Sequence, residues 1–253
     1  MSRKQLIRGL EKVKDYCPIL LCFPYAGGAA SAYRGWQEKI GEKAAVCAIQ
    51  LPGREDRLTE EPYTSMEKLL DDLVARISYY RENPLYLFGH SMGAKIAAET
   101  ARVLQDSGIR LAGLIVSASK TMNCPVEKPL SHLPKDMFIE ELVKFNGIPG
   151  ELLENPAALE YFIPMLRADF VLDETYDEQL KYKLNCPILA LCGSQDREAE
   201  YDSILAWREY TTGDFYSRVY PGDHFYIKKH EDEVIARIGD LILRNNAKEY
   251  IKI

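Results

Sequence analysis

Residues 85–93 read Leu-Tyr-Leu-Phe-Gly-His-Ser-Met-Gly, an apolar run that ends in a Gly-x-Ser-x-Gly pentapeptide. The pentapeptide alone is a weak signal, because glycine and serine are common and chance gives the pattern in roughly one chain in ten of this length. Its position is more informative. The apolar run predicts a buried strand, and residues 92–104 carry apolar side chains at helical spacing. Ser91 is therefore expected on a tight turn between a strand and a helix, as in a nucleophile elbow.

The same alternation of strand and helix extends in both directions from this turn. A second helical pattern occupies residues 63–80, before the run that leads to Ser91. Near-continuous apolar runs, typical of strands buried on both faces, occupy residues 18–23, 45–51, 85–88, 111–117 and 187–191. This order predicts an α/β fold with a mostly parallel central sheet and helices on both of its faces.

The alternation breaks from about residue 121 to residue 185, where no stretch has a convincing strand pattern. One helical pattern covers residues 134–145. A second begins at Asn155 and Pro156, an N-cap residue followed by proline at the first helical position. Pro164 is expected to kink this second helix. We therefore predict a helical insertion in the α/β core.

Length and composition agree with one core domain that carries an inserted cap. The core is expected to comprise residues 1–120 and 186–253, and the cap residues 121–185. No apolar stretch approaches the roughly 20 residues that span a bilayer, so no membrane association is expected. The first residues lack the apolar region of a secretion signal, which predicts a cytoplasmic protein.

The cysteines and the net charge exclude several classes of function. No cysteine pair has the spacing of a redox or zinc motif, so we expect no metal site. Five of the six cysteines lie in or beside apolar runs and are expected to be reduced structural thiols: Cys17, Cys22, Cys47, Cys186 and Cys192. The net charge of −6 argues against nucleic acid as a partner.

A serine nucleophile requires a base, and the base requires an orienting acid. His224 follows the last strand-like run, residues 217–220, and is the predicted base. Asp196 follows the preceding strand and is the predicted acid, whereas Asp223 shares a tight loop with His224 and is poorly placed to reach the imidazole. The ordered Ser91, Asp196 and His224 at three strand ends favour a catalytic serine.

The other three histidines, His90, His132 and His230, are expected to be structural or exposed. The side chain of His90 in particular should point away from the Ser91 hydroxyl. An oxyanion hole is expected from two backbone N–H groups, one on Met92 and one on the loop after the first strand. That loop contains two glycines at residues 27–28, which leaves Ala26 as the second predicted donor.

Six motifs in this order resemble those of the type II, or external, thioesterases that accompany nonribosomal peptide and polyketide synthetases. The motifs occupy residues 23–28, 51–57, 88–93, 166–170, 192–196 and 222–225. The resemblance covers nearly the whole chain except about a dozen residues at each end.

This resemblance implies an α/β-hydrolase that hydrolyses acyl or aminoacyl thioesters on the phosphopantetheine arm of carrier proteins. Such enzymes remove misprimed or stalled groups through an acyl-serine intermediate. By motif position, Ser91, Asp196 and His224 form the catalytic triad, and Ala26 and Met92 are the oxyanion donors. The insertion is the lid. The resemblance implies no cofactor and a transient partner, the carrier domain, and we take a monomer as the default.

Carrier proteins of such pathways are generally acidic, whereas residues 120–185 hold seven basic and twelve acidic residues. Like charges disfavour docking on the outer face of the insertion. We therefore expect weak docking through a local basic or apolar patch beside the substrate channel.

The roles of two further groups stay open between alternatives. Arg54 and Arg57 are expected to form structural salt bridges, with contact to the pantetheine phosphate as the alternative. An apolar stripe of the second cap helix either lines an acyl channel or packs on the sheet: Leu159, Phe162, Ile163, Leu166 and Phe170.

Three other functions compete with carrier-protein thioester hydrolysis. A small-molecule carboxylesterase or lipase would use the same residues on esters of simple alcohols. An acyltransferase would resolve the acyl-serine with an alcohol or amine. A non-catalytic binding module on this scaffold usually lacks a triad member, and the chain has all three. The fold alone does not separate these functions.

Overall fold

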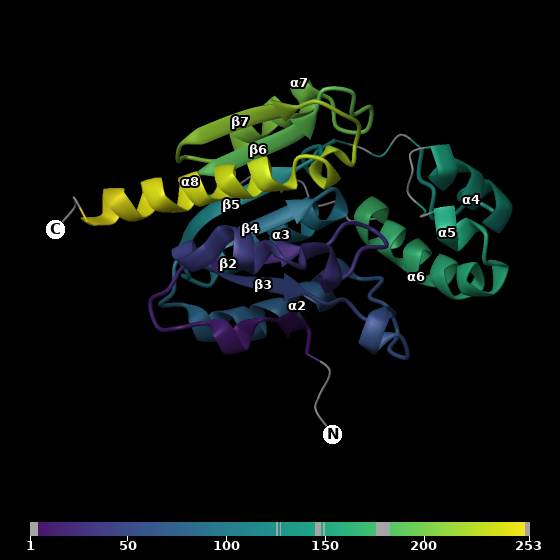
Figure 1. The fold of residues 1–253 in the computed structure, drawn as a ribbon, viewed down its shortest axis with the longest axis horizontal. Helices are drawn as coiled ribbons and strands as arrows, with labels where there is room; N and C mark the ends of the chain where they lie inside the picture. The colour runs from purple at the N-terminus through teal and green to yellow at the C-terminus, as the bar shows by residue number, and fades with distance from the viewer. Residues whose placement is uncertain are drawn as a thin grey trace.

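A seven-stranded sheet forms the centre of the computed structural model, which describes residues 5–124, 126, 128–144, 148, 150–175 and 183–250 (Figure 1). The strands lie in the order β1-β3-β2-β4-β5-β6-β7. Their bounds are β1 Ile7–Arg8, β2 Ile19–Phe23, β3 Ala45–Ile49, β4 Leu85–His90, β5 Leu111–Ser117, β6 Ile188–Gly193 and β7 Phe215–Tyr220. Only β1 is antiparallel to its neighbour; all other adjacent pairs are parallel.

Helices cover both faces of the sheet because successive side chains of a strand point to opposite sides. Side chains such as Leu21 pack with α2 (Met66–Ile77) and α3 (Met92–Asp106). Their neighbours, such as Cys22, face α1 (Trp36–Ile40) and α8 (Glu231–Tyr250). The chain thus has two apolar cores separated by the sheet, which agrees with the predicted α/β class.

Among the described residues between β5 and β6, three helices gather at one end of the molecule (Figure 1). They are α4 (Lys135–Lys144), α5 (Gly150–Leu153) and α6 (Pro156–Thr175). Phe138 and Ile163 belong to a separate apolar cluster built largely from this segment. The insertion therefore carries a small core of its own beside the two cores of the sheet.

The sequence pattern predicted most elements to within a few residues. The two predicted cap helices correspond to α4 and α6, although Phe145, the last residue of the first prediction, lies outside the described residues. Helix α6 continues through Pro164. The two-residue β1, the four-residue α5 and the five-residue α1 and α7 (Tyr201–Leu205) were not predicted, because elements this short show no periodicity. The 20-residue α8 was not predicted either.

The six cysteines are free thiols, and four of them are buried. The buried thiols, Cys22, Cys47, Cys186 and Cys192, agree with the structural role expected of them, whereas Cys17 is only partly buried. In the described ranges, no helix has the length and apolar character required to cross a membrane.

Candidate active site

Ser91 occupies a sharp turn between β4 and α3. Its φ of 55° and ψ of −125° lie in a region that costs a non-glycine residue about 1–3 kcal/mol. The Ser91 N–H donates to the carbonyl of Ser117 on β5 at 2.8 Å, and the Ser91 carbonyl accepts from Ala94 at 2.9 Å. The turn is therefore fixed from both sides, and Ser91 occupies the N-cap position of α3, where the helix dipole favours negative charge.

The glycines of the pentapeptide are required by close backbone contacts. A Cβ at Gly89 would lie 2.0 Å from the carbonyl oxygen of Gly93, and one at Gly93 would lie 2.2 Å from the carbonyl oxygen of Phe23. Neither partner is a flexible side chain. The crossing of β2, β4 and α3 at this point therefore excludes any side chain at the two positions.

The structure brings together Ser91, His224 and Asp196, the three residues selected from the sequence. Nε2 of His224 lies 3.0 Å from Oγ of Ser91. On the other side of the ring, Nδ1 lies 3.0 Å and 3.1 Å from the two carboxylate oxygens of Asp196. The residues follow β4, β6 and β7, whose carboxyl ends lie along one edge of the parallel sheet.

Asp196 is held independently of the histidine. Its side chain is fully buried. One carboxylate oxygen also accepts hydrogen bonds from the backbone N–H groups of Glu198 at 2.9 Å and Ala199 at 3.0 Å. The loop of Asp196 thus fixes the carboxylate independently of its contact with the His224 ring.

The neighbouring acid and the other histidines have different roles. Asp223 accepts a hydrogen bond from the backbone N–H of Phe225, as its tight loop suggested. His132 is exposed, and His230 pairs with Glu233 at 2.9 Å. These positions agree with the structural or exposed roles predicted for them.

His90 is buried and belongs to a polar chain behind the candidate site. Its Nδ1 lies 2.8 Å from Oγ of Ser117, which lies 2.6 Å from the hydroxyl of Tyr226. Burial, with the nearby charges of His224 and Lys228, lowers the pKa of His90 well below its usual value of 6.5. The His90 ring therefore stays neutral, and its centroid lies 5.3 Å from that of His224.

The two predicted oxyanion donors lie on segments that meet at the elbow. Met92 is the first residue of α3, where a backbone N–H has no partner within its own helix. Ala26 lies on the loop after β2, and the next two N–H groups of that loop are engaged. Gly27 donates to the Asp169 carboxylate at 2.8 Å, and Gly28 donates to the Tyr25 carbonyl at 2.8 Å.

Both arginines of the 51–57 motif form ion pairs, as favoured from the sequence. Arg54 binds Asp169, and both side chains are buried. Arg57 binds Glu60 at 2.6 Å and donates to the carbonyl of Gln50 at 2.7 Å. The sequence did not single out Asp169 as a site residue, although it lies in the Leu-Arg-Ala-Asp-Phe motif at residues 166–170.

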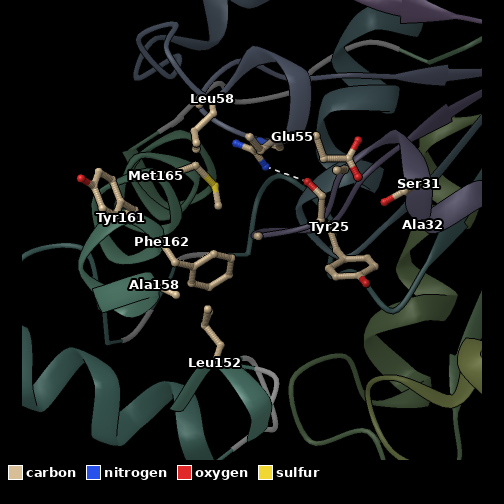
Figure 2. Close-up of a pocket in the computed structure, with 15 residues that line it drawn as sticks. Tyr25, Ser31, Ala32, Glu55, Leu58, Leu152, Ala158, Tyr161, Phe162 and Met165 are labelled. Carbon is tan, nitrogen blue, oxygen red and sulfur yellow. Dashed lines mark hydrogen bonds between the residues drawn. The ribbon is translucent and has the colours of Figure 1, made fainter. Parts of the chain in front are cut away.

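A cavity of about 410 Å³ opens between α6 and the loops that follow β2 and β3. Phe162 of α6 and Tyr25 face each other across it (Figure 2). The cavity is lined mainly by apolar groups, but Ser91 and His224 do not line it. Tyr25 contacts Phe225, and Phe225 contacts His224, with ring centroids 5.3 Å and 5.2 Å apart. Two aromatic side chains in contact therefore link the wall of the cavity to the imidazole.

The apolar stripe of α6 has a divided role. Phe162 lines the cavity, whereas Ile163 and Leu166 are buried in the small core of the insertion. Phe170 packs edge-on against Phe138 at a centroid distance of 5.5 Å. In the described part of the chain, no cluster of three His, Cys, Asp or Glu side chains is arranged to hold a metal ion.

Comparison with known proteins identifies the family of the chain. The family described as "Thioesterase domain" matches residues 18–242. The chain is 38% identical over 218 residues to the gramicidin S biosynthesis protein GrsT of Aneurinibacillus migulanus. The aligned region covers 85% of each sequence. It is 35% identical over 239 residues to the thioesterase PikA5 of Streptomyces venezuelae, over 94% of this chain and 85% of the relative.

A solved structure gives the same result for the fold. RedJ, a thioesterase from the prodiginine biosynthetic pathway in Streptomyces coelicolor, superposes with a TM-score of 0.81 at 37% identity. The match covers 88% of this chain and 85% of RedJ. By its sequence, its sheet and its elbow, the chain belongs to the thioesterase domain family and has the α/β-hydrolase fold.

Proposed function

We propose that the chain is a type II thioesterase that hydrolyses acyl or aminoacyl thioesters on the phosphopantetheine arm of carrier proteins. In this role it removes misprimed or stalled groups during nonribosomal peptide or polyketide synthesis. The relatives GrsT and PikA5 support the proposal, because the first is named for gramicidin S biosynthesis and the second as a thioesterase. Among the chain's own features, the hydrogen-bonded series from Ser91 through His224 to Asp196 carries it.

The first half of the proposed reaction transfers the acyl group to the enzyme. Oγ of Ser91 attacks the thioester carbonyl carbon while Nε2 of His224 takes the hydroxyl proton. Asp196 stabilises the resulting imidazolium through Nδ1. The backbone N–H groups of Met92 and Ala26 stabilise the oxyanion of the tetrahedral intermediate.

Collapse of this intermediate breaks the carbon–sulfur bond and restores the carbonyl of an acyl-serine. The pKa of a thiol lies near 8.5, so the sulfur leaves with much less help from an acid than an amine requires. The proton on His224 neutralises the departing thiolate. No cofactor is needed for this step.

The second half regenerates the enzyme. His224 removes a proton from water, and the hydroxide attacks the acyl-serine carbonyl through a second tetrahedral intermediate at the same oxyanion donors. Return of the proton to Oγ of Ser91 releases the free acid. The products are a carboxylic acid and a carrier protein with a free thiol.

The insertion at residues 121–185 is proposed to act as the lid over the substrate. Its helix α6 supplies Phe162 and Met165 to the 410 Å³ cavity, and the loop that carries Ala26 supplies Tyr25 to the same cavity. We assign the apolar part of the acyl group to this space. Burial of each methylene there contributes about 0.8 kcal/mol to binding.

The proposed partner is a carrier domain, which docks only transiently. The thioesterase itself is proposed to be a cytoplasmic monomer. The acidic excess of the insertion disfavours docking of an acidic carrier on its outer face. Leu58 and Tyr161 line the cavity and are 56% and 75% exposed. They provide an apolar patch of the kind expected at the docking site.

Steady-state kinetics on matched acyl groups tests this function against its alternatives. The proposal predicts a higher kcat/KM for an acetyl-loaded carrier protein than for p-nitrophenyl acetate. A faster reaction with the simple ester would favour a carboxylesterase. Product acyl groups found on an added alcohol or amine in place of water would favour an acyltransferase, and no turnover of any substrate would favour a binding module.

A further inference from the structure

A buried ion pair joins the insertion to the loop that follows β3. Arg54 and Asp169 are separated by 115 residues in the sequence, and their side chains are only 5% and 1% exposed. Two nitrogens of the guanidinium group bind the two carboxylate oxygens, Nη1 to Oδ2 at 2.8 Å and Nη2 to Oδ1 at 2.6 Å. This two-fold contact fixes the orientation of both groups as well as their distance.

Both members of the pair also bind the loop that carries Ala26. Oδ2 of Asp169 accepts the backbone N–H of Gly27 at 2.8 Å. Nη1 of Arg54 donates to the carbonyl oxygen of Gly28 at 2.8 Å. The peptide groups on the C-terminal side of Ala26 are therefore held by an ion pair whose two halves come from different parts of the chain.

The loop after β3 is tied to the same segment by a second contact. The side-chain amide of Gln50 donates to the carbonyl of Arg54 at 3.3 Å, and its oxygen accepts the N–H of Ala30 at 2.9 Å. Nε of Arg54 donates to the carbonyl of Pro52 at 3.2 Å. Contacts within its own loop thus position Arg54, in addition to its contacts with the Ala26 loop.

Packing of α6 leaves the loop little freedom. Gly27 has a φ of 77°, and a Cβ there would lie 3.0 Å from the Phe162 ring and 3.1 Å from Leu166. Ala26 packs against the core that the sheet forms with α2 and α3, and against the small core of the insertion. The direction of the Ala26 N–H therefore depends on the position of α6. The ion pair between Asp169 of α6 and Arg54 holds this helix in place.

We propose that Arg54 and Asp169 are positioning residues for catalysis, which fix the Ala26 N–H at the place where the oxyanion develops. The inference rests on the serine mechanism proposed above. A buried ion pair is a weak means of stabilising a fold, because apolar residues of similar volume are often as good. Its geometric effect on the Ala26 loop gives the pair a function that apolar residues do not supply.

The first test is Asp169→Asn, which keeps the shape of the side chain and removes its charge. We expect kcat for p-nitrophenyl acetate to fall about 100-fold, since a misplaced oxyanion donor costs a factor of this size. KM should change less than about threefold, because the donor acts on the transition state. The simple ester is chosen because its cleavage does not depend on carrier recognition.

A second readout measures the oxyanion site without turnover. A trifluoromethyl ketone adds reversibly to the serine hydroxyl and places an oxyanion in the proposed hole. Its inhibition constant should rise in Asp169→Asn by about the same factor as kcat/KM falls. A purely structural role for the pair would not link the two quantities.

The double variant Arg54→Met/Asp169→Leu distinguishes loss of the positioning role from loss of folding. It replaces the ion pair by apolar side chains, a change that often leaves stability unaltered or higher. We expect thermal unfolding near that of the wild type together with the same loss of kcat. Glu60→Gln is the matched control, since it breaks the Arg57–Glu60 pair on the same loop and should leave kcat within about threefold.

The outcomes separate this inference from the function on which it rests. Ser91→Ala must abolish ester cleavage, and retained activity there would overturn the serine mechanism itself. If Ser91→Ala is inactive while Asp169→Asn and the double variant keep kcat and inhibitor affinity within about threefold, the positioning role is wrong. An equal loss in Glu60→Gln would also contradict it.

Discussion

The imidazole of His224 bridges the Asp196 carboxylate and the Ser91 hydroxyl, with Nδ1 3.0 Å from Asp196 and Nε2 3.0 Å from Ser91. Because Asp196 accepts at Nδ1, the proton of the neutral ring lies on that nitrogen and Nε2 is free to act as the base. The carboxylate also receives two backbone N–H bonds, so its position does not depend on the histidine.

Replacement of Asp196 by Asn should lower kcat about 10⁴-fold with little effect on KM. The amide favours the wrong tautomer of His224 and no longer stabilises the imidazolium. Steady-state kinetics on p-nitrophenyl acetate measures the effect. Asp223→Asn is the matched control, because Asp223 is adjacent to His224 in sequence but binds the Phe225 N–H. A comparable loss in both variants would refute the assignment of the acid.

The backbone strain at Ser91 predicts that the turn required for the nucleophile lowers the stability of the fold. Glycine adopts the φ of 55° and ψ of −125° without strain, whereas alanine and serine adopt them only at an energetic cost. Ser91→Gly should therefore be more stable than Ser91→Ala by about 1 kcal/mol, after the higher chain entropy of unfolded glycine is subtracted. Urea unfolding of both variants measures the difference. A less stable glycine variant would show that the turn is unstrained.

His90 should make stability depend on pH. Its pKa is lowered in the folded protein by burial, whereas the unfolded chain has a value near 6.5. The unfolded state therefore binds more protons below that value, so this contribution to stability is complete above pH 6.5 and is lost as pH falls toward the folded-state pKa. The slope is at most about 1.4 kcal/mol per pH unit.

The variant His90→Asn removes this titration and provides the comparison. Denaturant unfolding at pH 7.5 and pH 5.5 gives the free energy of unfolding of the wild type and of the variant at each pH. We expect the wild type to lose more stability than the variant over this interval. Equal losses would mean that His90 is not held neutral by burial.

Phe162 should limit the length of acyl chain that the enzyme accepts. Phe162→Ala enlarges the cavity between α6 and Tyr25, so kcat/KM for an octanoyl group should rise at least about fivefold relative to acetyl. A series of acyl-loaded carrier proteins measures the preference. Phe170→Ala, on the same helix but packed on Phe138, should leave it unchanged. An equal change for all chain lengths would place the pantetheine arm in this cavity in place of the acyl group.

The elbow and its two partners were predictable because each depends on local signals at a strand end. Ser91 lies between an apolar strand and an amphipathic helix, Asp196 follows an apolar run, and His224 follows the strand-like run at residues 217–220. Parallel strands place their carboxyl ends along one edge, so the three side chains were expected at the same edge of the sheet. The spatial order of the strands, which sets the distances between these side chains, was not predicted.

The contact between Arg54 and Asp169 was not predictable in the same way. A salt bridge for Arg54 was expected, but a pattern of charges does not name a partner 115 residues distant. The pairing depends on how the insertion packs against the core, which periodicity does not encode. The same reason explains why the sequence left the role of the α6 stripe open, since Phe162 and Ile163 are neighbours with different surroundings.

Intact-protein mass spectrometry of an acyl-loaded carrier protein tests the central claim most directly. The carrier is incubated with wild type or with Ser91→Ala, and its mass is followed over time. We predict that wild type removes the acyl mass and leaves the free phosphopantetheine thiol, whereas the carrier incubated with Ser91→Ala stays loaded. A carrier that keeps its acyl group with the wild-type enzyme, or loses it equally fast with Ser91→Ala, would contradict the proposed thioesterase.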